Sequence, residues 1–115
     1  MTTAIEATGM IRTMVKLEAN DGESVNDALT RISHRYGLPF WPLSHLRKGN
    51  AKKLDGSLGD KIRRAYLDFC ATFVARMELG ICRMKAAGHD LDGIGAEVAA
   101  LAGKIRAERA ALKRP

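Results

Sequence analysis

The sequence predicts an all-α protein, in which a pair of short helices joined by a tight turn precedes a long helix and a C-terminal helix that form an antiparallel hairpin. Three observations lead to this prediction. Apolar residues recur every three or four positions along most of the 115-residue chain. Glycines and residues that cap helices separate the apolar runs. The alternation of apolar and polar residues that is typical of a strand occurs in one segment only.

The first element, residues 3–19, carries its apolar side chains on one helical stripe. This stripe consists of Ala7, Ile11, Met14 and Val15. Residues 10–17 also alternate between apolar and polar, so the same segment would permit a strand. The sequence leaves the two alternatives open. Asn-Asp-Gly at residues 20–22 is a clear break after this element.

The second element begins after Ser24, which suits a helix N-cap, and Asp27 follows three positions later in a near capping-box arrangement. Its apolar residues recur at helical spacing. They are Val25, Ala28, Leu29, Ile32 and Tyr36. We therefore expect a helix that ends before Gly37.

Residues 30–49 contain the residue types that two short helices crossing at a steep angle require. Gly37 can adopt the positive φ of the turn, and Ser33, one helical turn earlier, is small enough for the helix contact. The apolar residues expected to face the crossing are Ile32, Tyr36, Leu38, Leu43 and Leu46. These features resemble the helix-turn-helix of small bacterial or phage-type regulators of the Cro and repressor kind, and residues 46–49, Leu-Arg-Lys-Gly, resemble the end of their second helix.

The chain departs from this family in two ways. The family most often has Ala where this chain has Ser33, and the second helix of this chain contains Pro39 and Pro42. Proline is tolerated in the first turn of a helix, where its missing N–H has no intrahelical partner. We therefore expect the second helix to begin near Pro39 or Phe40 and to be short.

The resemblance implies sequence-specific binding of double-stranded DNA, with residues 39–48 in a major groove. At 100° per residue, Leu43 and Leu46 define the buried side of the second helix. The candidates for contact with base edges are Phe40, Trp41, Ser44, His45 and Lys48. For Trp41 the alternative is that its ring packs back against another helix, and the sequence does not decide between the two.

The net charge of +6 is concentrated around the same segment. Nine basic and two acidic side chains give residues 31–64 a net charge of +7, whereas residues 1–30 carry −3. Such a patch is expected where a protein neutralises phosphates. The candidates for contact with the DNA backbone are Arg47, Lys52, Lys53, Arg63 and Arg64. The alternative is that these side chains form an ordinary solvated surface.

The next element, residues 57–87, shows the apolar spacing of one long amphipathic helix. Its stripe consists of Leu58, Ile62, Tyr66, Phe69, Phe73, Met77, Ile81 and Met84. Residues 88–90 form a turn with Asp90 as N-cap, and a last helix follows with spacings of three and four. The apolar seam of that helix consists of Leu91, Ile94, Val98, Leu101, Ile105 and Leu112. An antiparallel hairpin lets each helix cover the stripe of the other.

The hairpin carries more large apolar side chains than a minimal three-helix core can bury. The surplus consists of Phe69, Phe73, Met77 and Met84. We therefore expect residues 1–56 to bind DNA and residues 57–115 to form a dimerisation region, within one compact unit. The alternative is a monomer whose hairpin folds back over its own helix-turn-helix.

Several function classes find no support in the sequence. No apolar run approaches the length of a membrane span and the first residues lack a signal pattern, so we expect a cytoplasmic, nucleoid-associated protein without membrane contact. The histidines are scattered, and Cys70 and Cys82 are expected to be buried thiols, so we expect no metal, cofactor or enzyme activity. The function expected is transcription regulation. The alternatives are a helical assembly protein, a non-specific nucleic-acid-associated protein and, less favoured, an RNA-binding protein.

Overall fold

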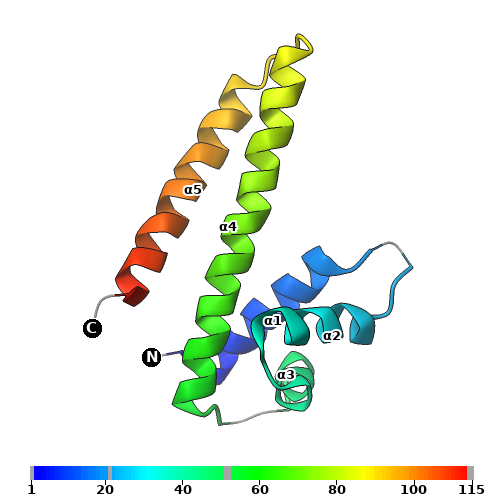
Figure 1. Ribbon diagram of the computed structural model, residues 1–115. Helices are drawn as coiled ribbons and strands as arrows, with labels where there is room; N and C mark the ends of the chain where they lie inside the picture. Colours follow the sequence, from blue (N-terminus) through cyan, green and yellow to red (C-terminus); the bar gives the residue numbers. More distant parts are fainter. Residues whose placement is uncertain (1, 21, 51–52, 114–115) are drawn as a thin grey trace. The chain divides into compact units, whose positions relative to one another are not determined.

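The computed structural model describes residues 2–20, 22–50 and 53–113, and this part of the chain is helical without any strand. Its helices are α1 (Ala4–Glu18), α2 (Val25–Tyr36), α3 (Phe40–Arg47), α4 (Gly56–Ala86) and α5 (Asp92–Lys113), shown in Figure 1. The expected all-α class is confirmed. None of the described helices combines the length and apolarity needed to cross a membrane.

The chain divides into two compact units, Met1–Tyr66 and Leu67–Pro115. The boundary lies inside α4, whereas the sequence suggested one before this helix, at residue 56. The difference arises because Ile62 and Ala65 are buried side chains of the first unit, so the first turns of α4 belong to its core. Each unit therefore takes part of the same long helix.

Helix α1 is a helix and not a strand, which resolves the alternative that the sequence left open. Its N-terminus is closed by a capping box, in which the Thr3 hydroxyl accepts a hydrogen bond from the Glu6 N–H (3.1 Å) and the Glu6 carboxylate accepts one from the Thr3 N–H (3.4 Å). The stripe expected from the sequence, which includes Ile11 and Met14, is buried.

Helix α2 begins after Ser24, whose hydroxyl accepts a hydrogen bond from the Asp27 N–H at 3.2 Å. It ends at Gly37, which adopts the left-handed conformation with φ of 63°. The Leu38 N–H donates to the Ser33 carbonyl at 3.0 Å, and the Ser33 hydroxyl donates to the Leu38 carbonyl. Ser33 therefore holds the turn through hydrogen bonds, which Ala in its place could not do with its side chain.

Helix α3 is short, as the two prolines predicted, and it contacts both α1 and α2. Pro39 precedes its first residue, and Pro42 lies in its first turn. Leu43 and Leu46 are buried, together with Leu38 from the turn. Tyr36, at the end of α2, is only half-buried. The buried core around the turn therefore contains one side chain fewer than the sequence predicted.

The second unit is an antiparallel hairpin of α5 and the later turns of α4, and Figure 1 shows α5 running back beside α4. Its core consists of Val74, Val98, Ala102 and Ile105, with Cys70, Ala71 and Ile81 packed against them. An ion pair between Lys85 and Asp92 (2.8 Å) lies at the turn end of the hairpin. A second ion pair, between Arg109 and Asp68 (3.3 Å), lies toward the other end.

The seam of α5 differs from the expected one. Ala102 lies in the core, whereas Ile94 and Leu101 are exposed. A helix that packs against a single neighbour buries only a narrow stripe, so apolar side chains at the edge of the stripe stay uncovered. Of the surplus side chains on α4, Phe69 is buried within the single chain, contrary to expectation, while Met77 and Met84 are exposed and Phe73 is half-buried.

The two cysteines also differ from expectation. Cys70 is half-buried beside the hairpin core, and Cys82 is exposed. Twelve positions separate them along one helix, so that they lie about 18 Å apart and cannot bond within one chain.

Replacing Gly37 by Ala should destabilise the first unit by about 1 to 2 kcal/mol, because a Cβ atom is strained at positive φ. No atom lies within 4 Å of a Cβ built at Gly37, so the cost comes from the backbone and not from a clash. Gly9→Ala is the matched control, because Gly9 lies in the interior of α1 with equal space around it and should gain about 1 kcal/mol in helix propensity. Urea unfolding of both variants measures the difference, and an unchanged Gly37→Ala protein would contradict the strained turn.

Candidate nucleic-acid interface

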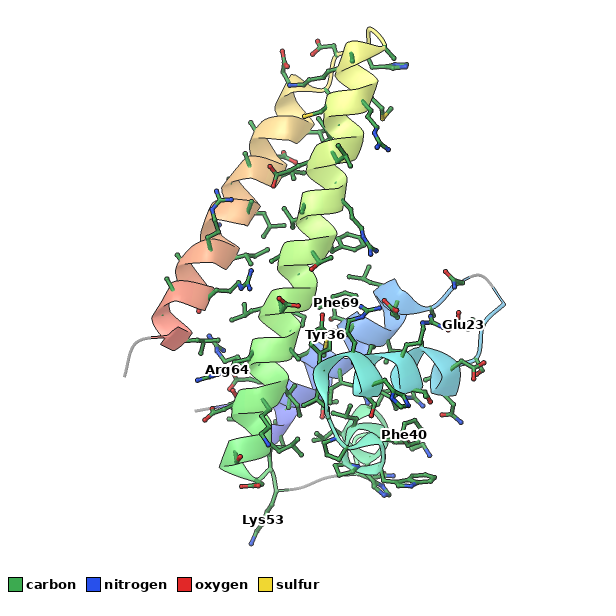
Figure 2. The ribbon with its side chains drawn as sticks, in the orientation of Figure 1. Glu23, Tyr36, Phe40, Lys53, Arg64 and Phe69 are labelled. Carbon is green, nitrogen blue, oxygen red and sulfur yellow. The ribbon has the colours of Figure 1, made fainter. Side chains whose placement is uncertain are left out.

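The outward face of α3 is formed by three side chains at helical spacing, Trp41, His45 and Lys48. Trp41 is 68% exposed, which excludes the alternative that its ring packs back into the first unit. Its ring stands edge-on to that of Phe40, with 5.1 Å between the ring centres and 83° between the planes. Phe40 is half-buried and is labelled in Figure 2. An aromatic pair therefore occupies the surface at the start of α3.

Ser44 does not lie on this face. The angular estimate placed it outward as a base-contacting residue, but only 4% of it is exposed. The estimate assumed that α3 buries one stripe, defined by Leu43 and Leu46. Because α3 contacts two helices, α1 and α2, it buries a wider sector, and a small side chain on the flank is covered as well. The prediction for Ser44 was wrong.

The C-terminal end of α3 is held by Arg12, a residue of α1 that the sequence analysis did not select. The Arg12 Nε atom donates a hydrogen bond to the Arg47 carbonyl at 2.8 Å. A cation at a helix C-terminus is favourable because the last carbonyls carry partial negative charge. Arg12 lies in the acidic first 30 residues, so averaging charge along the chain concealed it.

The basic side chains that were expected to contact the DNA backbone have different surroundings from one another in the structure. Lys53 is exposed and lines, together with His45 and Pro42, a hollow of about 320 Å³ beside α3. Lys52 lies outside the described residues. Arg47 is half-buried, and its Nε atom is buried without a hydrogen-bond partner among the described residues.

The two arginines on α4 differ from each other as well. Arg64 is two positions beyond buried Ile62, which places it on the opposite side of α4, and Figure 2 shows it pointing away from α3. The expectation that Arg64 lies beside α3 is therefore wrong. Arg63 is half-buried at the edge of the same helix. Of the four candidates that lie within the described residues, Lys53 is the one that the structure brings beside the exposed face of α3.

An ion cluster joins the end of α1 to α2. Glu18 lies 3.2 Å from Arg31 and 2.7 Å from Arg35, and Glu23 lies 2.6 Å from Arg31. The hydrogen bond from Arg31 is the main reason that the pKa of Glu23 is held below its ordinary value. The same bond raises the pKa of Arg31. Two of the nine basic side chains in residues 31–64 are thus neutralised within the protein.

Nothing in the described ranges of the chain gathers three or more side chains of the metal-binding types. Comparison with protein-family models, with curated protein sequences and with solved structures gives no match for this chain. The interpretation of α3 therefore depends on its own geometry and charge.

The ion cluster should make the stability of the first unit depend on acid pH. The lowered pKa means that ionised Glu23 stabilises the folded state above the ordinary value of 4.5, and this stabilisation is lost as the pH falls through 4.5 and below. Glu23→Gln should therefore be less stable than the wild type at pH 7 and should converge with it in acid, as measured by urea unfolding across this range. Glu78→Gln, a change at an exposed carboxylate of α4, is the control. A constant gap between wild type and Glu23→Gln at all pH values would refute this origin of the pH dependence.

Proposed function

We propose that the protein binds double-stranded DNA in a sequence-specific manner and acts as a transcription regulator, with α3 entering a major groove. The observation that supports this proposal most is the outward face of α3, where Trp41, His45 and Lys48 follow a turn of helix-turn-helix type at Gly37. The proposal gives the protein a binding role and no catalytic step.

The chemistry of this face suits a DNA groove. An exposed aromatic ring can contact thymine methyl groups and sugars, an imidazole can exchange hydrogen bonds with base edges, and an ammonium group can contact phosphate. Trp41 has 68% of its surface exposed, and an exposed aromatic side chain of this size favours a surface that contacts a partner over a merely solvated one. Phe40, which supports the Trp41 ring, extends the apolar part of the contact.

The phosphate contacts come from fewer residues than the local charge suggests. Arg31 and Arg35 are engaged with Glu18 and Glu23, and Arg64 points away from α3. We propose Lys48 and Lys53 as the main contacts with the DNA backbone, with Lys52 and Arg63 as further candidates. This smaller set still implies a strong dependence of affinity on salt.

We further propose that two copies bind together. Helix α3 has eight residues, so one copy reads only a few base pairs, and pairing two copies on half-sites doubles the sequence that is recognised. The exposed Met77 and Met84 on α4 supply apolar surface for such pairing. The same surface favours the second candidate function, a helical assembly protein that binds DNA without sequence preference.

Selection of bound sequences from a random duplex library separates these two functions. Enrichment of a short, two-fold symmetric site is expected for the regulator, and no enrichment despite retained binding would favour the assembly protein. Affinity for the selected site should fall by about a hundredfold or more between ~50 and ~200 mM salt if four or more phosphates are contacted. A salt-independent affinity would exclude an electrostatic interface.

Single substitutions then test the two roles on this surface. Lys53→Ala should weaken binding to all sequences about equally, because a phosphate contact carries no sequence information. His45→Ala should instead reduce the preference at particular base pairs. Arg64→Ala, an exposed arginine on the far side of α4, is the control for Lys53 and should change affinity little. Equal effects of all three substitutions on every sequence would show that the groove-facing side is assigned wrongly.

A further inference from the structure

The turn that ends α3 satisfies its last carbonyls from two sources. The N–H groups of Gly49 and Asn50 each donate at 3.0 Å to carbonyls of the last turn, and Gly49 has a φ of 78°, which is the pattern of a Schellman motif. The carbonyl of Arg47 accepts its hydrogen bond from outside the helix, from Nε of Arg12 at 2.8 Å. A side chain of α1 thus completes the end of α3.

The guanidinium of Arg12 touches this end with one of its edges. In addition to the bond from Nε, its Nη2 atom lies 3.5 Å from the place that a Cβ atom at Gly49 would take. A guanidinium is planar and has five N–H donors, of which the bond to the Arg47 carbonyl uses one. The second edge, formed by Nη1 and Nη2, therefore remains for another acceptor.

The protein itself provides no anionic partner for Arg12 within the part of the chain that the structure describes. Arg31 and Arg35 are paired there with Glu18 and Glu23, whereas no carboxylate forms an ion pair with Arg12, which is exposed. A cap for one carbonyl needs a single donor, so the charge and the second edge of this guanidinium exceed what the end of α3 requires.

The end of α3 is a place where DNA phosphates would come close. A helix has about the same diameter as the major groove has width, so the ends of a helix in the groove lie near the phosphates on its borders. The last carbonyls of α3 carry partial negative charge, which opposes a phosphate unless cations outweigh it. Lys48, exposed at the C-cap, and Arg12 supply two such cations.

We infer that Arg12 contacts a phosphate of the DNA backbone through Nη1 and Nη2 at the C-terminal end of α3, beside Lys48. This inference rests on the proposed function and adds to it a contact from α1, outside the segment whose charge predicted the interface. The bond to the Arg47 carbonyl orients the guanidinium before DNA arrives. Less side-chain freedom is therefore lost on binding than with an unattached side chain.

The salt dependence of duplex binding tests this contact. Each phosphate contact contributes about 0.9 to the slope of log affinity against log salt, so Arg12→Gln should lower this slope by about one. Affinity at ~100 mM salt should fall by about three- to tenfold on every sequence alike, because a phosphate contact carries no sequence information. Arg12→Lys should keep the slope, since it keeps the charge. Arg64→Gln, on the far side of α4, is the matched control and should change the slope little.

Arg12 also fastens α3, and a purely structural role gives a different result. If Arg12 only fastened α3, Arg12→Gln would weaken the preference at base pairs that His45 contacts and would leave the salt slope unchanged. A phosphate contact predicts the reverse, with the preference kept and the slope lowered. Should Arg12→Gln lose helix content by circular dichroism, the same substitution is measured in the Gly9→Ala background, in which the added helix propensity stabilises α1.

The outcomes separate this inference from the proposed function. An unchanged slope in Arg12→Gln, while the wild type binds a selected DNA site, would overturn this inference alone. Binding without sequence preference, together with a lowered slope in Arg12→Gln, would overturn sequence-specific regulation and support the phosphate contact. A wild type that binds no duplex would overturn both.

Discussion

The left-handed turn at Gly37 is the constraint on which the first unit depends. The positive φ of this residue lets the chain reverse within a few residues, and the hydrogen bonds between Ser33 and Leu38 close the turn from both sides. Because α3 then meets both α1 and α2, its apolar side is enclosed by two helices and only one face remains outside. That face carries Trp41, His45 and Lys48. The turn at Gly37 sets the orientation of α3, and the candidate interface follows from that orientation.

Several cationic side chains of the first unit are engaged by ion pairs and hydrogen bonds within the chain itself. Glu18 and Glu23 bind Arg31 and Arg35, which fastens the end of α1 to α2 at the cost of two cations on the surface. Arg12 crosses from α1 to the last carbonyls of α3 in the same way. The cations beside the exposed face of α3 are therefore few and come from its C-terminal end and from the segment after it. The net charge summed over residues 31–64 therefore overstates the number of cationic side chains that are available to a polyanion.

The second unit shows the limit of a two-helix core. One helix can cover only one stripe of another, so α4 and α5 bury a narrow seam of small and branched side chains and leave larger ones outside. The ion pairs Lys85–Asp92 and Asp68–Arg109 connect the two helices near the two ends of this seam. Apolar side chains such as Met77, Met84 and Leu101 therefore remain exposed in the single chain.

The local elements of this protein were determined by the sequence alone. Capping residues such as Ser24, the glycine at the turn and the prolines before and within α3 act on their immediate neighbours, so helix ends and the short α3 were predictable from them. Tertiary structure decided what each helix face meets. Ser44 is buried because two helices enclose α3, Leu101 is exposed because only one helix covers α5, and Arg12 reaches Arg47 across 35 positions of the chain. Periodicity shows which residues share a face, but burial depends on how many neighbours surround that face, and only packing in three dimensions determines that number.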